Sequence, residues 1–145
     1  MEVIKYILQG DPVPLARPRV SGANRNIYDS QKLLKRSLLF QLMEQHGSRP
    51  PYSGPCHLDA VFYMKMPKGS ISKTAANVGK PHIFKPDTDN LIKLICDICC
   101  MSEDGDGPGV LLNDDCVVFS ITAKKLYDVN PRTEFTITEI NEKKQ

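Results

Sequence analysis

Residues 85–97 read KPDTDNLIKLICD, and this stretch fixes the middle of the fold. Pro86 keeps the chain extended, because its ring fixes φ and disfavours helix in the residue before it. After Pro86, four apolar residues recur at the three- and four-residue spacing of one helix face. They are Leu91, Leu94, Ile95 and Ile98. The pattern predicts a helix over about 88–100 that begins directly after two carboxylates, Asp87 and Asp89.

Strand-like patterns lie on both sides of this helix. Residues 56–66, CHLDAVFYMKM, alternate with the two-residue period of a strand. One face of that strand consists of Leu58, Ala60, Phe62, Met64 and Met66. Residues 110–128 predict a long strand with Val117, Phe119, Ile121 and Ala123 on one side. Residues 133–140, TEFTITEI, predict a last strand that pairs antiparallel with the long one.

The first third of the chain predicts a strand, an extended segment and a second helix. Residues 2–8 alternate like a strand, and the three prolines in residues 10–22 exclude a helix there. Residues 30–46 predict a helix with an apolar spacing at Leu34, Leu38 and Leu42, a cap at Asp29 or Ser30, and a stop at Gly47. The order β-α-β-α-β-β predicts a single α+β domain over residues 1–145, in which two helices pack on a mixed sheet.

The composition is that of an ordinary globular protein. The chain has 145 residues, of which 41% are hydrophobic and 25% are charged, and its apolar stretches are too short to span a bilayer. The N-terminus lacks the basic start and apolar core of a signal peptide, so we expect a cytoplasmic protein without a membrane partner. The five cysteines are odd in number and crowded, which favours small side chains in a reduced core over disulfides or zinc.

Charge is distributed unevenly along the chain. Residues 65–85 contain five lysines, one histidine and no acid, whereas residues 87–115 contain eight acids and one base. Basic surface attracts polyanions, and clustered acids often hold a hard cation. A solvated basic loop followed by an acidic turn would explain the same charges, and the charges alone do not decide between these interpretations.

The acids after Pro86 are the first candidate for chemistry. One aspartate at a helix start is explained by capping, because its carboxylate accepts hydrogen bonds from free backbone N–H groups, but capping does not require two. Asp89, Lys93 and Asp97 follow at i, i+4 and i+8 and share one helix face. This spacing fits either surface ion pairs or a lysine held beside a carboxylate cluster to contact phosphate.

A third acid comes from the sequence LLNDDCVV. Adjacent strand residues point to opposite faces, so only one of Asp114 and Asp115 joins a given cluster. Asp115 shares parity with the predicted helix-facing side chains, and we expect it to face the start of the second helix. Asp87, Asp89 and Asp115 together suit Mg²⁺, with Mn²⁺ as a substitute, because both ions prefer oxygen ligands. Such a site activates water and clamps a phosphodiester.

These motifs resemble the RusA-type Holliday junction resolvases, a family of small endonucleases found in phages and prophages. The resemblance rests on KPDTDNLIK, on LLNDDCVV and on the overall layout, including PVPLARPRV and TEFTITEI, and it covers nearly the whole chain. It implies a Mg²⁺-dependent homodimer that cuts four-way DNA junctions by paired nicks in DNA recombination and repair. It assigns Asp87, Asp89 and Asp115 as catalytic metal ligands and Lys93 as the supporting base or phosphate contact.

The remaining expectations concern partners. Basic side chains predicted to contact DNA are Arg17, Arg19, Lys68, Lys73, Lys80 and Lys85. Apolar candidates for a dimer interface are Val61, Tyr63 and Val118. Two rival functions remain open: a non-catalytic nucleic-acid-binding protein with a structural metal, and a metal-dependent phosphoesterase that acts on small nucleotides.

Overall fold

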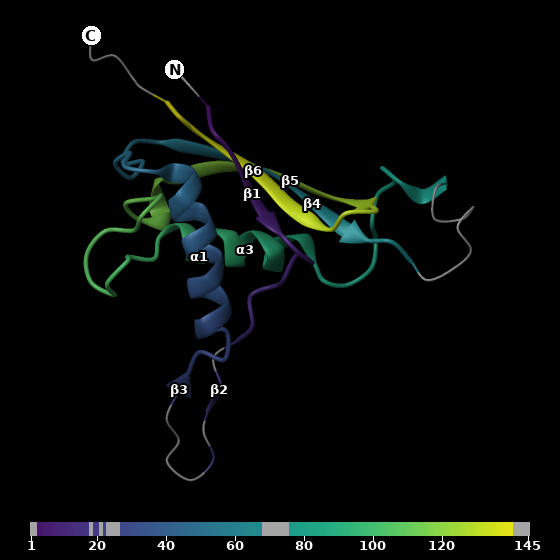
Figure 1. The fold of residues 1–145 in the computed structure, drawn as a ribbon, viewed down its shortest axis with the longest axis horizontal. Coiled ribbons are helices and arrows are strands. Elements are labelled where there is room, and N and C mark those ends of the chain that lie inside the picture. The colour runs from purple at the N-terminus through teal and green to yellow at the C-terminus, as the bar shows by residue number, and fades with distance from the viewer. Residues whose placement is uncertain (1–2, 18, 21, 23–26, 68–75, 141–145) are drawn as a thin grey trace.

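A computed structural model describes residues 3–17, 19–20, 22, 27–67 and 76–140. Its elements are β1 (Lys5–Gln9), β2 (Arg19–Val20), β3 (Ile27–Tyr28), α1 (Lys32–His46), β4 (Cys56–Lys65), α3 (Thr88–Cys99), the 3-10 helix η1 (Asp115–Val117), β5 (Val118–Asp128) and β6 (Arg132–Glu139). Both α1 and α3 lie on the same side of a four-stranded sheet, and the short β2–β3 pair projects away from it (Figure 1). The predicted α+β order and mixed sheet are confirmed.

The direction of the strands determines where α3 lies. The strand order is β1-β6-β4-β5, in which β6 is antiparallel to β1 and β4, whereas β5 is parallel to β4. A parallel pair needs a crossover connection, which here includes α3. The helix therefore runs back along the sheet, so that β4 ends near the start of α3 and β5 begins near its end (Figure 1).

The predicted pairing of the last two strands is wrong. β4 lies between β5 and β6, and β6 takes β1 as its second partner. β4 is therefore an inner strand, and β5 lies at an edge of the sheet. Along its ten residues β4 alternates buried and less buried side chains. Arg132, at the start of β6, contacts both of the other two strands. Its guanidinium lies 3.9 Å from the ring centre of Tyr63 on β4 and donates to Asp128 on β5.

The predicted long strand begins at Val118 and not at residue 110. Leu111 and Leu112 are both fully buried, which an alternating strand does not allow, and their N–H groups donate to the carbonyl of Cys99. Gly109 allows the chain to pass close to the end of α3, because a Cβ there would lie 2.5 Å from Cys100 Cα. The segment before β5 is thus packed against the end of α3.

The helix α1 begins and ends close to the predicted bounds. Gly47 terminates it with φ +68°, as predicted, but Gln31, and neither Asp29 nor Ser30, occupies the N-cap position. The Gln31 side chain instead accepts from the Ala16 N–H and donates to the Pro14 carbonyl, which fastens the proline-rich segment to α1. The most buried face of α1 consists of Lys35, Leu39, Leu42 and His46, so the predicted positions Leu34 and Leu38 lie at its margin.

The core lies between the sheet and the two helices. All four residues of the predicted α3 stripe are buried in it, together with the predicted inward residues of β4 up to Met64. β1 and β6 contribute Tyr6, Leu8, Phe135 and Ile137. Within the described ranges, no helix is long and apolar enough to cross a membrane.

Candidate metal centre

The first carboxylate of the centre, Asp87, occupies the N-cap position of α3 without capping it. Its side chain accepts no hydrogen bond from the first turn, although its backbone is extended as a cap residue requires. Instead, Lys85 Nζ lies 3.0 Å from Asp87 Oδ1 and 3.1 Å from Oδ2. The carboxylate is half-exposed, and among the described residues its ion-pair partner is an exposed lysine, so it is available to another cation.

Asp89 lies in the first turn of α3, where the positive end of the helix dipole favours a carboxylate. Its Oδ2 lies 4.0 Å from Lys93 Nζ in an exposed i, i+4 pair. Asp97, the third residue of this spacing, pairs with Lys35 of α1. The interpretation as a simple row of surface ion pairs therefore describes only the first half of the helix face.

Other basic residues reach the start of α3 from distant parts of the chain. Lys125 Nζ donates to the carbonyls of Phe84 (2.6 Å) and Pro86 (2.7 Å), which ties the approach to α3 onto β5. The N–H of Leu15 donates to the Asn90 carbonyl at 3.0 Å, so the proline-rich segment runs beside the first turn. Arg17 follows two residues later and is exposed.

The third predicted ligand, Asp115, lies at the other end of α3. It begins η1, directly before β5, and Asp114 precedes it as the cap of η1 and accepts from the Cys116 N–H. A hydrogen bond between the two carboxyl groups raises the pKa of Asp115, and burial and the negative charges of Asp114 and Asp97 raise it further. The same hydrogen bond lowers the pKa of Asp114.

Two cysteines locate Asp115 relative to α3. Burial raises the pKa of Cys96 to about 11, and the charge of Asp115 is the next cause. Burial and then the charge of Asp115 also raise the pKa of Cys100 to about 11. Cys96 lies in the last turn of α3, Cys100 follows the helix directly, and η1 contacts α3, so Asp115 lies beside the C-terminal end of the helix.

The expectation that Asp115 faces the start of the second helix is wrong. In a parallel crossover the second strand begins where the helix ends, and the expectation did not include this reversal. From Asp89 to Asp97 the helix rises about 12 Å, whereas two oxygens on one Mg²⁺ lie within about 4 Å of each other. Within the part of the chain that the structure describes, no three His, Cys, Asp or Glu side chains form a group that could hold a metal ion. The assignment of Asp87, Asp89 and Asp115 as ligands stays a prediction.

The predicted DNA contacts are placed only in part. Lys80 and Lys85 are exposed, like Arg17. Lys85 lies directly before α3, whereas the carbonyl of Lys80 accepts from the Tyr127 N–H of β5. Arg19 lies in β2, and its side chain is not described. Lys68 and Lys73 lie outside the described residues.

Sequence reasoning missed Lys35, which is 7% exposed and bonds to Asp97 from the neighbouring helix. Its position in the sequence carried a signal, because Lys35 shares the helix spacing of Leu39, Leu42 and His46. A lysine on a buried helix face predicts a carboxylate partner, since an unpaired buried charge is costly.

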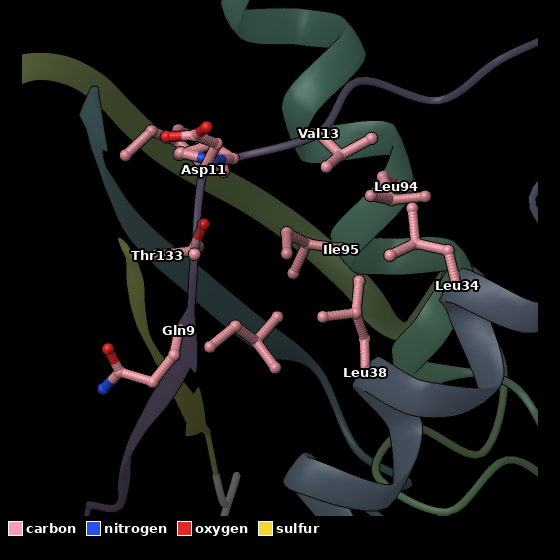
Figure 2. Close-up of a pocket in the computed structure, with 12 residues that line it drawn as sticks. Gln9, Asp11, Val13, Leu34, Leu38, Leu94, Ile95 and Thr133 are labelled. Atoms are coloured by element: carbon pink, nitrogen blue, oxygen red, sulfur yellow. The ribbon is translucent and has the colours of Figure 1, made fainter. Parts of the chain in front are cut away.

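One cavity of the described residues lies away from these acids, whereas a shallower and larger one at the start of α3 is lined by Lys85, Asp87 and Thr88. The first, of about 240 Å³, opens between the segment after β1 and the two helices, and Leu34, Leu38, Leu94 and Ile95 line it (Figure 2). Neither Asp87, Asp89 nor Asp115 contributes to its walls. Its apolar lining suits neither a metal nor a phosphate, so the candidate centre remains at the exposed ends of α3.

Comparison with known proteins agrees with the motifs. Residues 9–138 match the family model described as endodeoxyribonuclease RusA. A relative in Bacillus subtilis (strain 168), the uncharacterized protein YqaN, is 28% identical over 150 residues, which cover 97% of this chain and 99% of that protein. The match includes all three predicted ligands and both ends of α3.

Proposed function

The chain belongs to the RusA endodeoxyribonuclease family, and from this premise we propose that it is a Mg²⁺-dependent enzyme that resolves four-way DNA junctions. The reaction consists of paired nicks in the cytoplasm, in the course of DNA recombination and repair. The observation that supports this most directly is the pair of exposed carboxylates at the start of α3, which capping does not explain. Exposed cations beside them suit a polyanionic substrate.

The donor set fits a hard divalent cation. Asp87, Asp89 and Asp115 would hold Mg²⁺, or Mn²⁺ in its place, and the bound ion would supply an activated water and neutralise charge on the scissile phosphate. Each of these carboxylates is exposed, and the crowding of negative charge at Asp115 favours a cation there. Lys93 and Lys85 contact phosphate oxygens once the carboxylates beside them are engaged.

We propose further that the protein acts as a homodimer in which each metal site is shared. Within one chain, Asp89 lies at the start of α3 and Asp115 beside its end, and the helix rises about 12 Å between residues 89 and 97. A two-fold axis beside the middle of α3 would bring the start of one α3 next to the end of the other. Asp87 and Asp89 then complete a site with Asp115 of the partner subunit. Two equivalent sites also match the two-fold symmetry of a four-way junction.

Exposed apolar side chains support this arrangement, because they flank both sets of acids. Ile83 and Phe84, which precede Asp87, are 80% and 66% exposed. Phe119 and Ile121, which follow Asp115, are 58% and 47% exposed. Antiparallel association would cover the first pair with the second and remove both from water. This surface differs from the predicted interface residues Val61, Tyr63 and Val118, which the structure leaves partly buried.

The enzymatic activity is tested with a synthetic four-way junction and Mg²⁺, compared with a linear duplex of the same sequence. We expect symmetric nicks in the junction, no cleavage of the duplex, and no activity after chelation. Binding of the junction without cleavage under any divalent metal would indicate the non-catalytic protein. Hydrolysis of free nucleotides without junction cleavage would indicate the small-molecule phosphoesterase.

The shared site is tested by mixing inactive chains. Asp89→Asn and Asp115→Asn, each with its own affinity tag, are co-expressed, and mixed dimers are purified through both tags. One site of a mixed dimer carries both substitutions, and the other carries neither, so one strand of the junction should be nicked. A site contained in one chain predicts no activity in the mixture.

The matched control is a mixed dimer of Asp87→Asn and Asp89→Asn. These residues belong to the same half of the site, so each site of that dimer carries one defect. We expect no nicking, although the purification and the number of substitutions are the same. Nicking by both mixtures would contradict the assignment of Asp87 and Asp89 to one half-site.

A further inference from the structure

Lys125 of β5 contacts the chain directly before it enters α3. Its Nζ donates to the carbonyl of Phe84 at 2.6 Å and to the carbonyl of Pro86 at 2.7 Å. Lys125 pairs with Phe62 in the register of β5 and β4, and Phe62 belongs to the buried core. Because paired residues point to the same face of a sheet, the lysine lies on the side that carries the helices. The ammonium group thus joins an edge strand to a segment far earlier in the chain.

Backbone pairing with β5 ends before this segment. Among the described residues, the last backbone hydrogen bond in this direction runs from the His82 N–H to the Lys125 carbonyl at 3.0 Å. Beyond it, the two bonds from the Lys125 side chain are the hydrogen bonds that reach the backbone of residues 83–86 in the described part of the chain. The side chains of residues 83–85 are exposed and add little packing. The position of these residues therefore depends on Lys125.

This segment carries two side chains of the candidate site. Lys85 lies between the two residues whose carbonyls Lys125 binds, and Asp87 follows them directly. Lys85 Nζ lies 3.0 Å from Asp87 Oδ1, and both side chains are at least half-exposed. The Asp87 carbonyl accepts from the Leu91 N–H, which fixes Asp87 on the side of the helix. On the other side, the direction of Asp87 and Lys85 follows the backbone that Lys125 holds.

We propose that Lys125 is a positioning residue for DNA cleavage, which holds the backbone before α3 so that Lys85 and Asp87 face the same phosphodiester. Lys125 touches no reacting atom in this role and acts through two carbonyl groups. A lysine suits this role, since its ammonium group has three N–H donors and the two carbonyls accept from two of them. The inference rests on the proposed function, because it concerns how that site meets the junction.

The test separates binding of the junction from its cleavage. Lys125→Met keeps the aliphatic stem and removes the donors. Its single-turnover cleavage rate at saturating protein should fall by about 10- to 100-fold, because a misplacement of about 1 Å can cost about 100-fold. Junction affinity, measured by gel shift without divalent metal, should match the parent. Lys125→Arg should restore most of the rate, since a guanidinium group also donates to carbonyls.

Lys124→Met is the matched control. Lys124 is the exposed neighbour of Lys125 on β5 and points to the opposite face of the sheet, so this change removes the same charge and leaves residues 83–86 held. We expect the parent rate and affinity. An equal loss of cleavage in Lys124→Met would overturn the proposal, because the effect would then follow from net charge. A loss of junction affinity confined to Lys125→Met, with the parent rate at saturation, would also overturn it, because Lys125 would then bind phosphate directly.

Hydrogen exchange of the full-length protein gives a readout that does not depend on activity. In Lys125→Met, peptides that cover residues 83–90 should exchange faster than in the parent, whereas peptides from α1 should keep the parent rate. Unchanged exchange over residues 83–90 would overturn the proposal, and so would faster exchange throughout the protein. If Lys125→Met does not fold, Lys125→Gln replaces it in each measurement, because its shorter side chain keeps a polar end but cannot reach both carbonyls.

The outcomes also separate this inference from the proposed function. If the parent cleaves the junction and Lys125→Met cleaves it equally fast, only the role of Lys125 is refuted. If the parent cleaves no junction with any divalent metal, the proposed function fails and the inference fails with it.

Discussion

The two ends of α3 carry aspartates in contrasting surroundings. At the start, Asp87 and Asp89 lie beside surface lysines and at the favourable end of the helix dipole. At the end, a hydrogen bond with Asp114 and the charge of Asp97 are among the causes that raise the pKa of Asp115, which lies near the partly buried thiols of Cys96 and Cys100. The negative end of the dipole opposes carboxylates there. Positive charge thus offsets the carboxylates at the start of α3, whereas negative charge prevails around the carboxylates at its end.

This difference shows that the acids at the two ends of α3 do not form one site within a single chain. Negative charge is most concentrated at the end of α3, but the other two proposed ligands, Asp87 and Asp89, lie at its start. Within a single chain the length of the helix keeps these two groups apart. In the proposed homodimer, a second chain in antiparallel orientation would bring Asp87 and Asp89 of one α3 to the Asp115 end of the other.

The largest expected effect tests whether both ends serve one reaction. Asp89→Asn and Asp115→Asn should each lower junction cleavage by more than about 100-fold, because loss of a metal ligand exceeds the effect of losing a supporting residue. Cleavage is measured under single-turnover conditions, and junction binding by gel shift should survive in both variants. Asp114→Asn should cost less. If Asp115→Asn cleaved at the parent rate, Asp115 at the end of α3 would not be part of the site.

A smaller effect should follow from loss of the apolar contact beside the acids. Phe119→Asp places a charge on an exposed aromatic position, and a central interface residue of this kind contributes about 2 kcal/mol or more, which corresponds to about 30-fold in dimer affinity. Analytical ultracentrifugation measures the association, and cleavage should fall in parallel at low protein concentration. Leu33→Asp, which changes another exposed apolar residue on α1, is the control and should leave both unchanged.

The packing of α3 should respond modestly to a small change at its end. Ile98 is fully buried beside Cys99, and Ile98→Val should lower the free energy of unfolding by about 0.5–1.5 kcal/mol. Urea denaturation measures this loss. Lys93→Gln on the exposed face of the same helix should change stability by no more than about 0.5 kcal/mol. An equal loss of stability in the Ile98 and Lys93 variants would contradict the burial of Ile98.

The smallest expected effect reports on which end of α3 Asp115 occupies. Burial and then Asp115 raise the pKa of Cys100 to about 11, so few Cys100 thiols are ionised and reactive at neutral pH. In a Cys116→Ser background, Asp115→Asn should lower that pKa and speed iodoacetamide labelling of Cys100 a few-fold, since each pKa unit is tenfold in thiolate. Asp89→Asn should leave the rate unchanged. Mass spectrometry of the Cys100 peptide gives both rates.

Local pattern predicted most of the elements. The apolar spacing of α3 and the alternation of β4 appear directly in the sequence, and both faces are buried as predicted. The prediction for residues 110–128 was less accurate, because Leu111 and Leu112 resemble strand residues but tuck under the end of α3. Pairing of the last two strands also could not be read locally, since it depends on β4 entering between them.

The sequence by itself determined which side chains are available for chemistry: Asp87, Asp89 and Lys93 at a helix start, and Asp115 before a strand. Only the tertiary structure decided how they are grouped. Periodicity describes neighbours along one element, whereas the direction in which α3 returns between two parallel strands decides which end meets Asp115. The pairing of Lys35 with Asp97 has the same origin, because it depends on the contact of two helices that are far apart in the chain.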